Sequence, residues 1–202
     1  MRIEERALTM AGMGQRMFIA ITPPIEVIED LSEFLEPRRE QGLPFIDPAQ
    51  WHVTLAFMSE VPEYAVDELE ERLTDAAARR NPMTLRFHGG GCFPDPTRAK
   101  VLWLGLTGDT EELSRLAINV RAAATTAGAP VDGKAFVPHL TLSRLHHPIE
   151  ATRWLRILDS YDGPTWRVEH IDLIASHLHE GRRPRYEVVN SFDLGEHASY
   201  PA

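Results

Sequence analysis

The sequence predicts a duplicated fold of strands and helices in which two similar units share a cleft. A strand–helix–strand pattern occurs twice along the 202 residues, and one strand of each unit carries the same motif, His-x-Thr. The spacing is similar in both units, because 35 residues separate Met17 from His52 and 38 separate Val101 from His139. Patterns that recur at a similar spacing indicate repeated structural units.

The first unit begins with an apolar run at residues 17–21, which predicts a buried strand. Apolar residues then recur at helical spacing from 25 to 35, and Pro37 is expected to end this helix. The strand with the first motif covers residues 51–57. Between the two units we predict a helix at 66–76, a strand at 83–87 and a flexible loop at Gly89-Gly90-Gly91.

The second unit repeats this order with a strand, a helix that ends near Gly128, and the strand that carries the second motif. The predicted ranges are 101–106, 113–124 and 136–143, followed by a helix at 150–159 and strands at 168–175 and 187–194. Residues 16–194 therefore form one domain, with a flexible extension at 1–15 and a flexible tail at 195–202.

Composition limits the partners of this chain. The net charge is −9, whereas a protein that binds long nucleic acid through its backbone usually needs a basic surface, so we expect a small target such as a nucleotide or an RNA terminus. No apolar run approaches the ~20 residues of a membrane span, and the N-terminus lacks a signal-peptide core. With a single cysteine, Cys92, no intramolecular disulfide can form. We expect a cytoplasmic monomer that does not bind membranes.

Both motifs lie in predicted strands, where residues i and i+2 point to the same side. His52 and Thr54 therefore project together, and so do His139 and Thr141. The apolar residues between them project into the core. One copy of His-x-Thr is common by chance, but two copies in matching strands predict a site.

Two histidines and two threonines suit the hydrolysis of a cyclic phosphodiester. One imidazole takes a proton from water and the other gives a proton to the leaving sugar oxygen, which histidine can do near neutral pH. Thr54 and Thr141 can hold the non-bridging oxygens, and Arg144, five residues after His139, adds a positive charge. The scheme needs no metal ion and no cofactor.

These residues resemble the 2H phosphoesterase superfamily, and within it the RNA 2',3'-cyclic phosphodiesterases, also called 2'-5' RNA ligases. The likeness extends to residues 98–105, 136–144, 168–176 and 186–194. It implies a bilobal α+β fold with two antiparallel sheets facing a central cleft and helices outside. It also implies that His139 activates water and that His52 protonates the leaving 3' oxygen, which gives a 2'-phosphate, with weak reverse 2'-5' ligation.

One departure concerns the segment after the first motif, where the family often has an arginine followed by Phe-Leu-Gly. Here the residues are Ala56-Phe57-Met58-Ser59, which leaves the substrate open. Phe57 and Trp51 are candidates for stacking on a base, with core packing as the alternative. The substrate is an RNA 3' end or a small cyclic nucleotide. Another cyclic phosphate, such as ADP-ribose 1'',2''-cyclic phosphate, a non-catalytic module that binds RNA ends, and a metal-dependent hydrolase are the alternatives.

Further histidines, a cysteine, two tryptophans and an arginine-rich loop are also candidates for sites. His146-His147 and His177-x-His179 are interpreted as surface histidines, since no cysteine or His-Glu-x-x-His motif accompanies them. Cys92 and Trp103 are interpreted as structural, and Trp166 as core or cleft. The Arg182–Arg185 loop is a candidate for contact with an RNA backbone.

Overall fold

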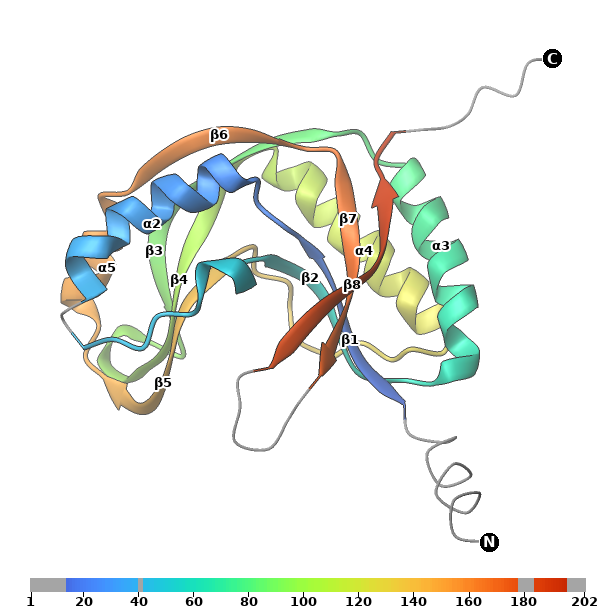
Figure 1. Cartoon of the computed structure of the whole chain (residues 1–202), viewed down its shortest axis with the longest axis horizontal. Coiled ribbons are helices and arrows are strands. Elements are labelled where there is room, and N and C mark those ends of the chain that lie inside the picture. Colours follow the sequence, from blue (N-terminus) through green and yellow to red (C-terminus); the bar gives the residue numbers. More distant parts are fainter. Residues whose placement is uncertain (1–13, 40–41, 178–183, 196–202) are drawn as a thin grey trace, which may run out of the picture.

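An eight-stranded antiparallel sheet forms the centre of the protein, in the order β6-β3-β4-β5-β2-β1-β7-β8 (Figure 1). The structure is a computed structural model and describes residues 14–39, 42–177 and 184–195. The extension and the tail expected from the sequence lie largely outside these residues. The strands are β1 (Gln15–Ile21), β2 (Val53–Val61), β3 (Met83–Phe93), β4 (Ala99–Gly108), β5 (Leu140–Ile149), β6 (Asp162–Val168), β7 (His170–His177) and β8 (Arg185–Asp193). The helices are α2 (Ile25–Arg39), α3 (Val66–Ala78), α4 (Thr110–Thr126) and α5 (Thr152–Asp159), with short 3-10 turns at Pro48–Gln50, Glu63–Ala65 and Pro96–Arg98.

The sheet consists of two four-stranded halves that meet between β2 and β5. We call β2, β1, β7 and β8 the His52 half, and β5, β4, β3 and β6 the His139 half. The halves pair through Val53 and Leu140, the one Cα pair that joins them. The predicted α+β class and the antiparallel pairing are therefore confirmed, but the two expected sheets are continuous at this point.

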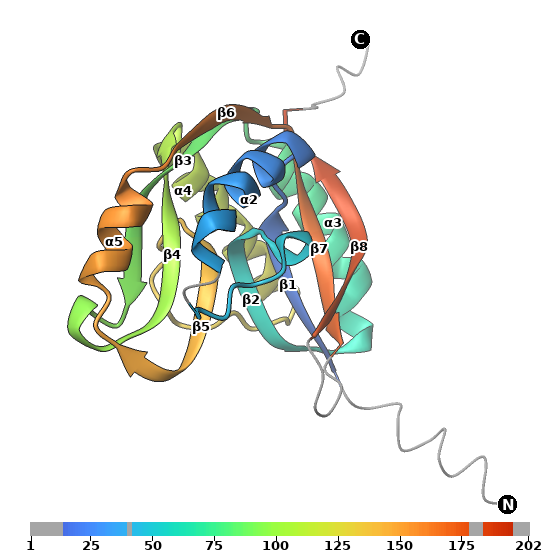
Figure 2. The ribbon, with the colours of Figure 1, turned by 60° about the vertical axis from the view of Figure 1, so that its left-hand side comes forward.

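Two helices cross between the halves. Helix α2 follows β1 in the chain but packs against β6 of the other half, where Tyr161 Oη donates a hydrogen bond to Asp30 Oδ1 (2.7 Å). Helix α4 follows β4 and packs against β2, beside α3. Figure 2 shows α5 and α3 at opposite ends of the sheet. The crossing helices thus tie the halves together from outside the central strand pair.

The predicted alternation around both motifs is confirmed. Val53, Leu55, Leu140 and Leu142 are at most 1% exposed and belong to the main hydrophobic core. Because side chains alternate along a strand, the residues between them face the other side, which we call the histidine face. A small second cluster, made of Phe18, Ala20 and Ile174, packs apart from the main core.

The triple glycine is part of a strand, and the predicted loop is wrong. Gly91 pairs with Trp103 within β3 and β4, and a Cβ atom at Gly91 would overlap Trp103 Cη2. A Cβ at Gly90 would lie 2.7 Å from Leu158 Cβ of α5. Because glycine has no side chain, these positions let the Trp103 indole and helix α5 pack closely against strand β3.

Several elements also differ from the predictions, for example β2, which covers Val53–Val61 instead of 51–57. Helix α2 includes Pro37 and ends at Arg39, because a proline in the last turn removes only one late hydrogen bond. Strand β6 was not predicted, since Gly163 and Pro164 are typical of loops, but β6 is an edge strand paired with β3 alone. Strand β5 begins at Leu140 instead of residue 136.

Candidate active site

The two His-x-Thr motifs meet at the centre of the sheet. In an antiparallel pair with Val53 opposite Leu140, His52 lies on the side of Thr141 and His139 on the side of Thr54. Each histidine immediately precedes its strand, since β2 begins at Val53 and β5 at Leu140. The structure therefore brings His52 and Thr54 together on one face with His139 and Thr141, although the two motifs lie 87 positions apart in the sequence.

His52 is held by its backbone and by two aromatic rings. Its Nδ1 lies 2.7 Å from the carbonyl oxygen of Gln50, at the end of the Pro48–Gln50 turn. A carbonyl oxygen can only accept, so Nδ1–H donates and Nε2 is the nitrogen that can take up a proton. The imidazole stacks on Phe18 with centroids 4.6 Å apart, and Tyr186 contacts it edge-on at 5.5 Å.

His139 is held in the same way by different residues. Its Nδ1 lies 2.6 Å from the carbonyl oxygen of Val137, which fixes the same tautomer. The rings of Phe93 and Trp103 lie 5.2 Å and 5.7 Å from the imidazole. Each histidine is thus oriented by a carbonyl two residues earlier and by an aromatic pair from its own half of the sheet.

Burial favours the neutral form of both imidazoles. It lowers the pKa of His52 to about 4, against the opposing effect of the Gln50 hydrogen bond, and the positive charges of Arg144 and His139 lower it further. Burial also lowers the pKa of His139, where the Val137 hydrogen bond opposes and Arg144 assists. Arg144 therefore lies close enough to act electrostatically on both histidines.

The other predicted site residues separate into two groups. Thr54 and Thr141 are half-buried beside the histidines, and Arg144 is exposed on β5. Phe57 is partly buried against the Phe18 cluster, where it remains a candidate for base contact. Trp51 is only 2% exposed in the main core, because it alternates with His52 and points the same way as Val53, so its predicted stacking role is wrong.

Four aromatic residues of the site were not predicted from the sequence: Phe18, Phe93, Trp103 and Tyr186. For Trp103 a signal existed, since buried Leu102 and Leu104 on either side of it place the indole on the opposite face. The interpretation of Trp103 as a structural core residue is wrong, because it is partly exposed beside His139.

The remaining candidates lie elsewhere. His146 and His147 are exposed on β5, Trp166 is in the core, and Cys92 is half-buried with a thiol pKa raised by burial. Arg182, Arg183 and His179 lie outside the described residues. Within the described ranges no three His, Cys, Asp or Glu side chains cluster as a metal site would, and no helix is both long and apolar enough to cross a bilayer.

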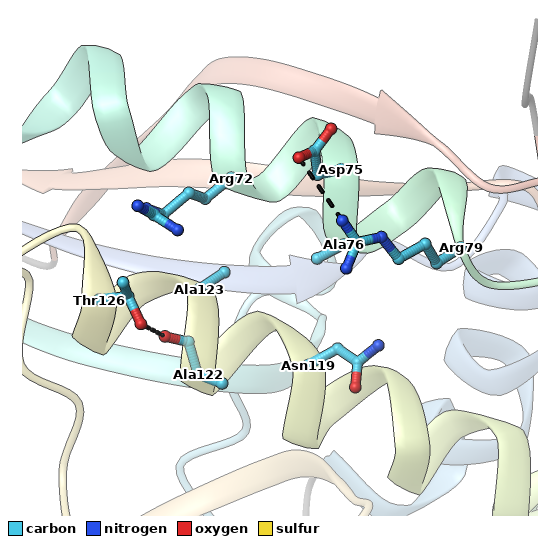
Figure 3. Close-up of a pocket in the computed structure, with 8 residues that line it drawn as sticks. All are labelled: Arg72, Asp75, Ala76, Arg79, Asn119, Ala122, Ala123 and Thr126. Carbon is cyan, nitrogen blue, oxygen red and sulfur yellow. Dashed lines mark hydrogen bonds and ion pairs between the residues drawn. The ribbon is translucent and has the colours of Figure 1, made fainter.

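A pocket of about 290 Å³ lies between α3 and α4, away from the histidines (Figure 3). Its Arg72 and Arg79 pair with Glu68 (2.5 Å) and Asp75 (3.7 Å) on the same helix. Since its lining contains no histidine, cysteine, serine or lysine, we assign the chemistry to the histidine face instead.

Comparison with known proteins identifies the family of this chain. Residues 23–180 match the 2'-5' RNA ligase superfamily. An RNA 2',3'-cyclic phosphodiesterase from Aquifex aeolicus is 32% identical over 75% of this chain and 81% of its own length. One from Thermus thermophilus is 32% identical over 90% of this chain and 92% of its own. The crystal structure of apo LigT from E. coli superposes with a TM-score of 0.73 at 26% identity and covers 91% of this chain and 99% of LigT. The chain belongs to the 2'-5' RNA ligase superfamily.

Proposed function

We propose that this protein hydrolyses the 2',3'-cyclic phosphate at RNA ends to a 2'-phosphate, with His139 as general base and His52 as general acid. The observation that carries the proposal is the meeting of the two motifs at Val53 and Leu140, with both Nδ1 atoms fixed by carbonyl oxygens. This leaves two Nε2 atoms for proton transfer on one face of the sheet. The scheme requires one acid and one base, which this arrangement supplies.

In the proposed reaction, the oxygen of a water molecule attacks phosphorus while Nε2 of His139 takes its proton. The bond between phosphorus and the 3' oxygen breaks, and Nε2–H of His52 gives its proton to that oxygen. The hydroxyl groups of Thr54 and Thr141 donate hydrogen bonds to the non-bridging oxygens. Arg144 offsets the negative charge that accumulates there.

The lowered pKa values of the two histidines suit a site in which substrate binding changes the protonation of His52. With a pKa of about 4, His52 is neutral at pH 7 in the free protein. A cyclic phosphate carries a negative charge, and an anion beside an imidazole raises its pKa. Substrate therefore supplies the charge that keeps His52 protonated for its role as an acid.

The nucleoside is proposed to lie on the His52 half. Phe57 and Tyr186 are partly exposed there, packed against buried Phe18, and aromatic rings are the usual supports for bases. Relatives support a nucleotide substrate, since those of Aquifex aeolicus and Thermus thermophilus are RNA 2',3'-cyclic phosphodiesterases. LigT of E. coli has also been solved in complex with 3'-AMP, with a TM-score of 0.73 to this chain.

The test is hydrolysis of adenosine 2',3'-cyclic phosphate in EDTA, with identification of the product isomer. We expect turnover that gives adenosine 2'-phosphate. Activity that EDTA abolishes would favour a metal-dependent hydrolase. No turnover of this compound or of an RNA oligomer with a cyclic phosphate end would refute the proposal, and tight binding of that oligomer without turnover would favour a binding module.

A further inference from the structure

Arg16 lies on the ring of Phe57 at the edge of the aromatic surface beside His52. Its guanidinium carbon is 4.5 Å from the Phe57 centroid, a distance typical of cation–π contact. Arg16 is exposed, and it shares a face of β1 with Phe18 and Ala20 because the three alternate along the strand. The guanidinium is therefore both supported by an aromatic ring and open to solvent.

The two motifs place different residues at the same offset. Five residues after His139 comes Arg144, and five residues after His52 comes Phe57. Arg16 from the neighbouring strand brings a guanidinium to the Phe57 position. Each half of the sheet therefore has a histidine, a threonine and a cation, although the cation of the His52 half comes from another strand. Ala56, at the position where the family often has arginine, is buried in the main core.

Arginines in the described strands also differ in their partners. Arg86, Arg167 and Arg185 each pair with a carboxylate at 3.0–3.2 Å. Among the described residues no carboxylate lies within ion-pair distance of Arg16 or Arg144. No carboxylate of the described residues therefore neutralises either guanidinium group, which is the feature expected of phosphate contacts.

Arg16 is too far from the histidines to serve the same phosphate as Arg144. Ala20 pairs with Thr54, and Arg16 precedes Ala20 by four residues, or about 13 Å of strand. Arg144 is as far along β5 from Leu140, but its charge contributes to the lowered pKa of both histidines. The guanidinium of Arg16 instead lies on Phe57 and contributes to neither pKa. An anion bound by Arg16 must lie beyond the terminal nucleoside, on its far side from the cyclic phosphate.

We propose that Arg16, supported by Phe57, binds the phosphate on the 5' side of the terminal nucleoside. The inference rests on the proposed function and deepens it. Arg16 then selects RNA ends and 5'-phosphorylated nucleotides over nucleoside cyclic phosphates. It also explains how a chain with net charge −9 holds an RNA end, since one local cation replaces a basic surface.

The experiment compares two substrates that differ by one phosphate: adenosine 2',3'-cyclic phosphate and its 5'-phosphorylated form. We expect wild type to prefer the 5'-phosphorylated form by about 10- to 100-fold in kcat/KM, mainly through KM, as for one charged hydrogen bond. Arg16→Ala should bring this ratio close to one, and Arg16→Lys should give an intermediate ratio. Arg115→Ala removes the same charge from exposed α4 and should keep the wild-type ratio.

The outcomes separate the two proposals. If wild type hydrolyses both substrates and Arg16→Ala keeps the wild-type ratio, the role of Arg16 is refuted while the proposed function stands. If Arg16→Ala lowers kcat/KM equally for both substrates, the ratio is also unchanged. That result would indicate a purely structural role for Arg16 and would refute phosphate binding. If wild type hydrolyses an RNA oligomer with a cyclic phosphate end but neither nucleotide, the inference fails while the proposed function stands. If it hydrolyses none of the three, both fail.

Discussion

In the His52 half the fifth residue after the histidine is Phe57, whereas in the His139 half it is Arg144. The aromatic neighbours also differ, because Phe18 and Tyr186 contact His52 while Phe93 and Trp103 contact His139. The means of holding the imidazole is nonetheless the same in both, a carbonyl oxygen two residues earlier at 2.6–2.7 Å.

The comparison separates what the chemistry needs from what the substrate needs. Proton transfer requires the tautomer and the orientation, and both halves keep them. The surroundings of the histidines differ, since the fifth residue after the histidine is an aromatic ring in one half and a guanidinium whose charge acts on both imidazoles in the other. In the proposed reaction the two equivalent histidines serve as acid and base, and the different residues around them distinguish a nucleoside side from a phosphate side.

The largest effect is expected when the histidine of one half is removed and that of the other half is kept. His52→Ala and His139→Ala should each lower kcat for adenosine 2',3'-cyclic phosphate by at least ~100-fold. The pH profile of the remaining activity distinguishes the roles. His139→Ala should lose the decline at low pH that comes from protonation of the base, and His52→Ala should lose the decline at high pH that comes from deprotonation of the acid. The opposite pairing of declines would reverse the assignment.

A smaller effect is expected when the charge difference between the halves is removed. Arg144→Ala should lower kcat/KM by about 10- to 100-fold, the scale of one charged hydrogen bond. The positive charge of Arg144 disfavours protonated imidazole and so lowers both pKa values. Its removal should therefore raise the pKa of His52 and of His139, and NMR titration of the imidazoles checks this. Arg144→Lys keeps a charge and is the control; pKa values that fall or stay constant in Arg144→Ala would contradict the account.

The smallest effect concerns the aromatic support of His139 alone. Gly91→Ala places a methyl group in the space of the Trp103 ring, so the indole must shift. We expect a several-fold loss of kcat and a loss of about 1–3 kcal/mol in stability, typical of overpacking. For a chain of this size that is roughly 2–4 °C of Tm per kcal/mol. Gly133→Ala is the matched control, since nothing lies within 4 Å of its Cβ. Wild-type activity and Tm in Gly91→Ala would show that the indole does not support His139.

The local part of the site could be predicted from the sequence because it depends on strand alternation. His52 with Thr54, and Val53 with Leu55, fall on opposite faces in any strand. The repeated motif and the apolar residues around it therefore predict which side chains lie on the histidine face and which lie in the core, whatever the strand order. The same alternation favours the core alternative for Trp51, which shares the side of Val53 and is 2% exposed.

Long-range contacts could not be predicted in this way. Phe18 and Tyr186 reach His52 from strands β1 and β8, and their pairing depends on the strand order. The contact of Arg16 with Phe57 likewise depends on the register of β1 and β2, which contains irregularities. The sequence does not distinguish Gly91 from a loop glycine, because a strand glycine that allows close packing is the same residue type.

The crossing of α2 and α4 has a consequence for how the chain folds. Each half of the sheet is covered by a helix whose own strands belong to the other half. A fragment containing only one half would leave part of its core face open to water. The His52 half also takes strands from both ends of the chain, since β1 pairs with both β2 and β7. We therefore expect the two halves to unfold as one cooperative unit, and neither half to fold alone without a partner for its exposed core face.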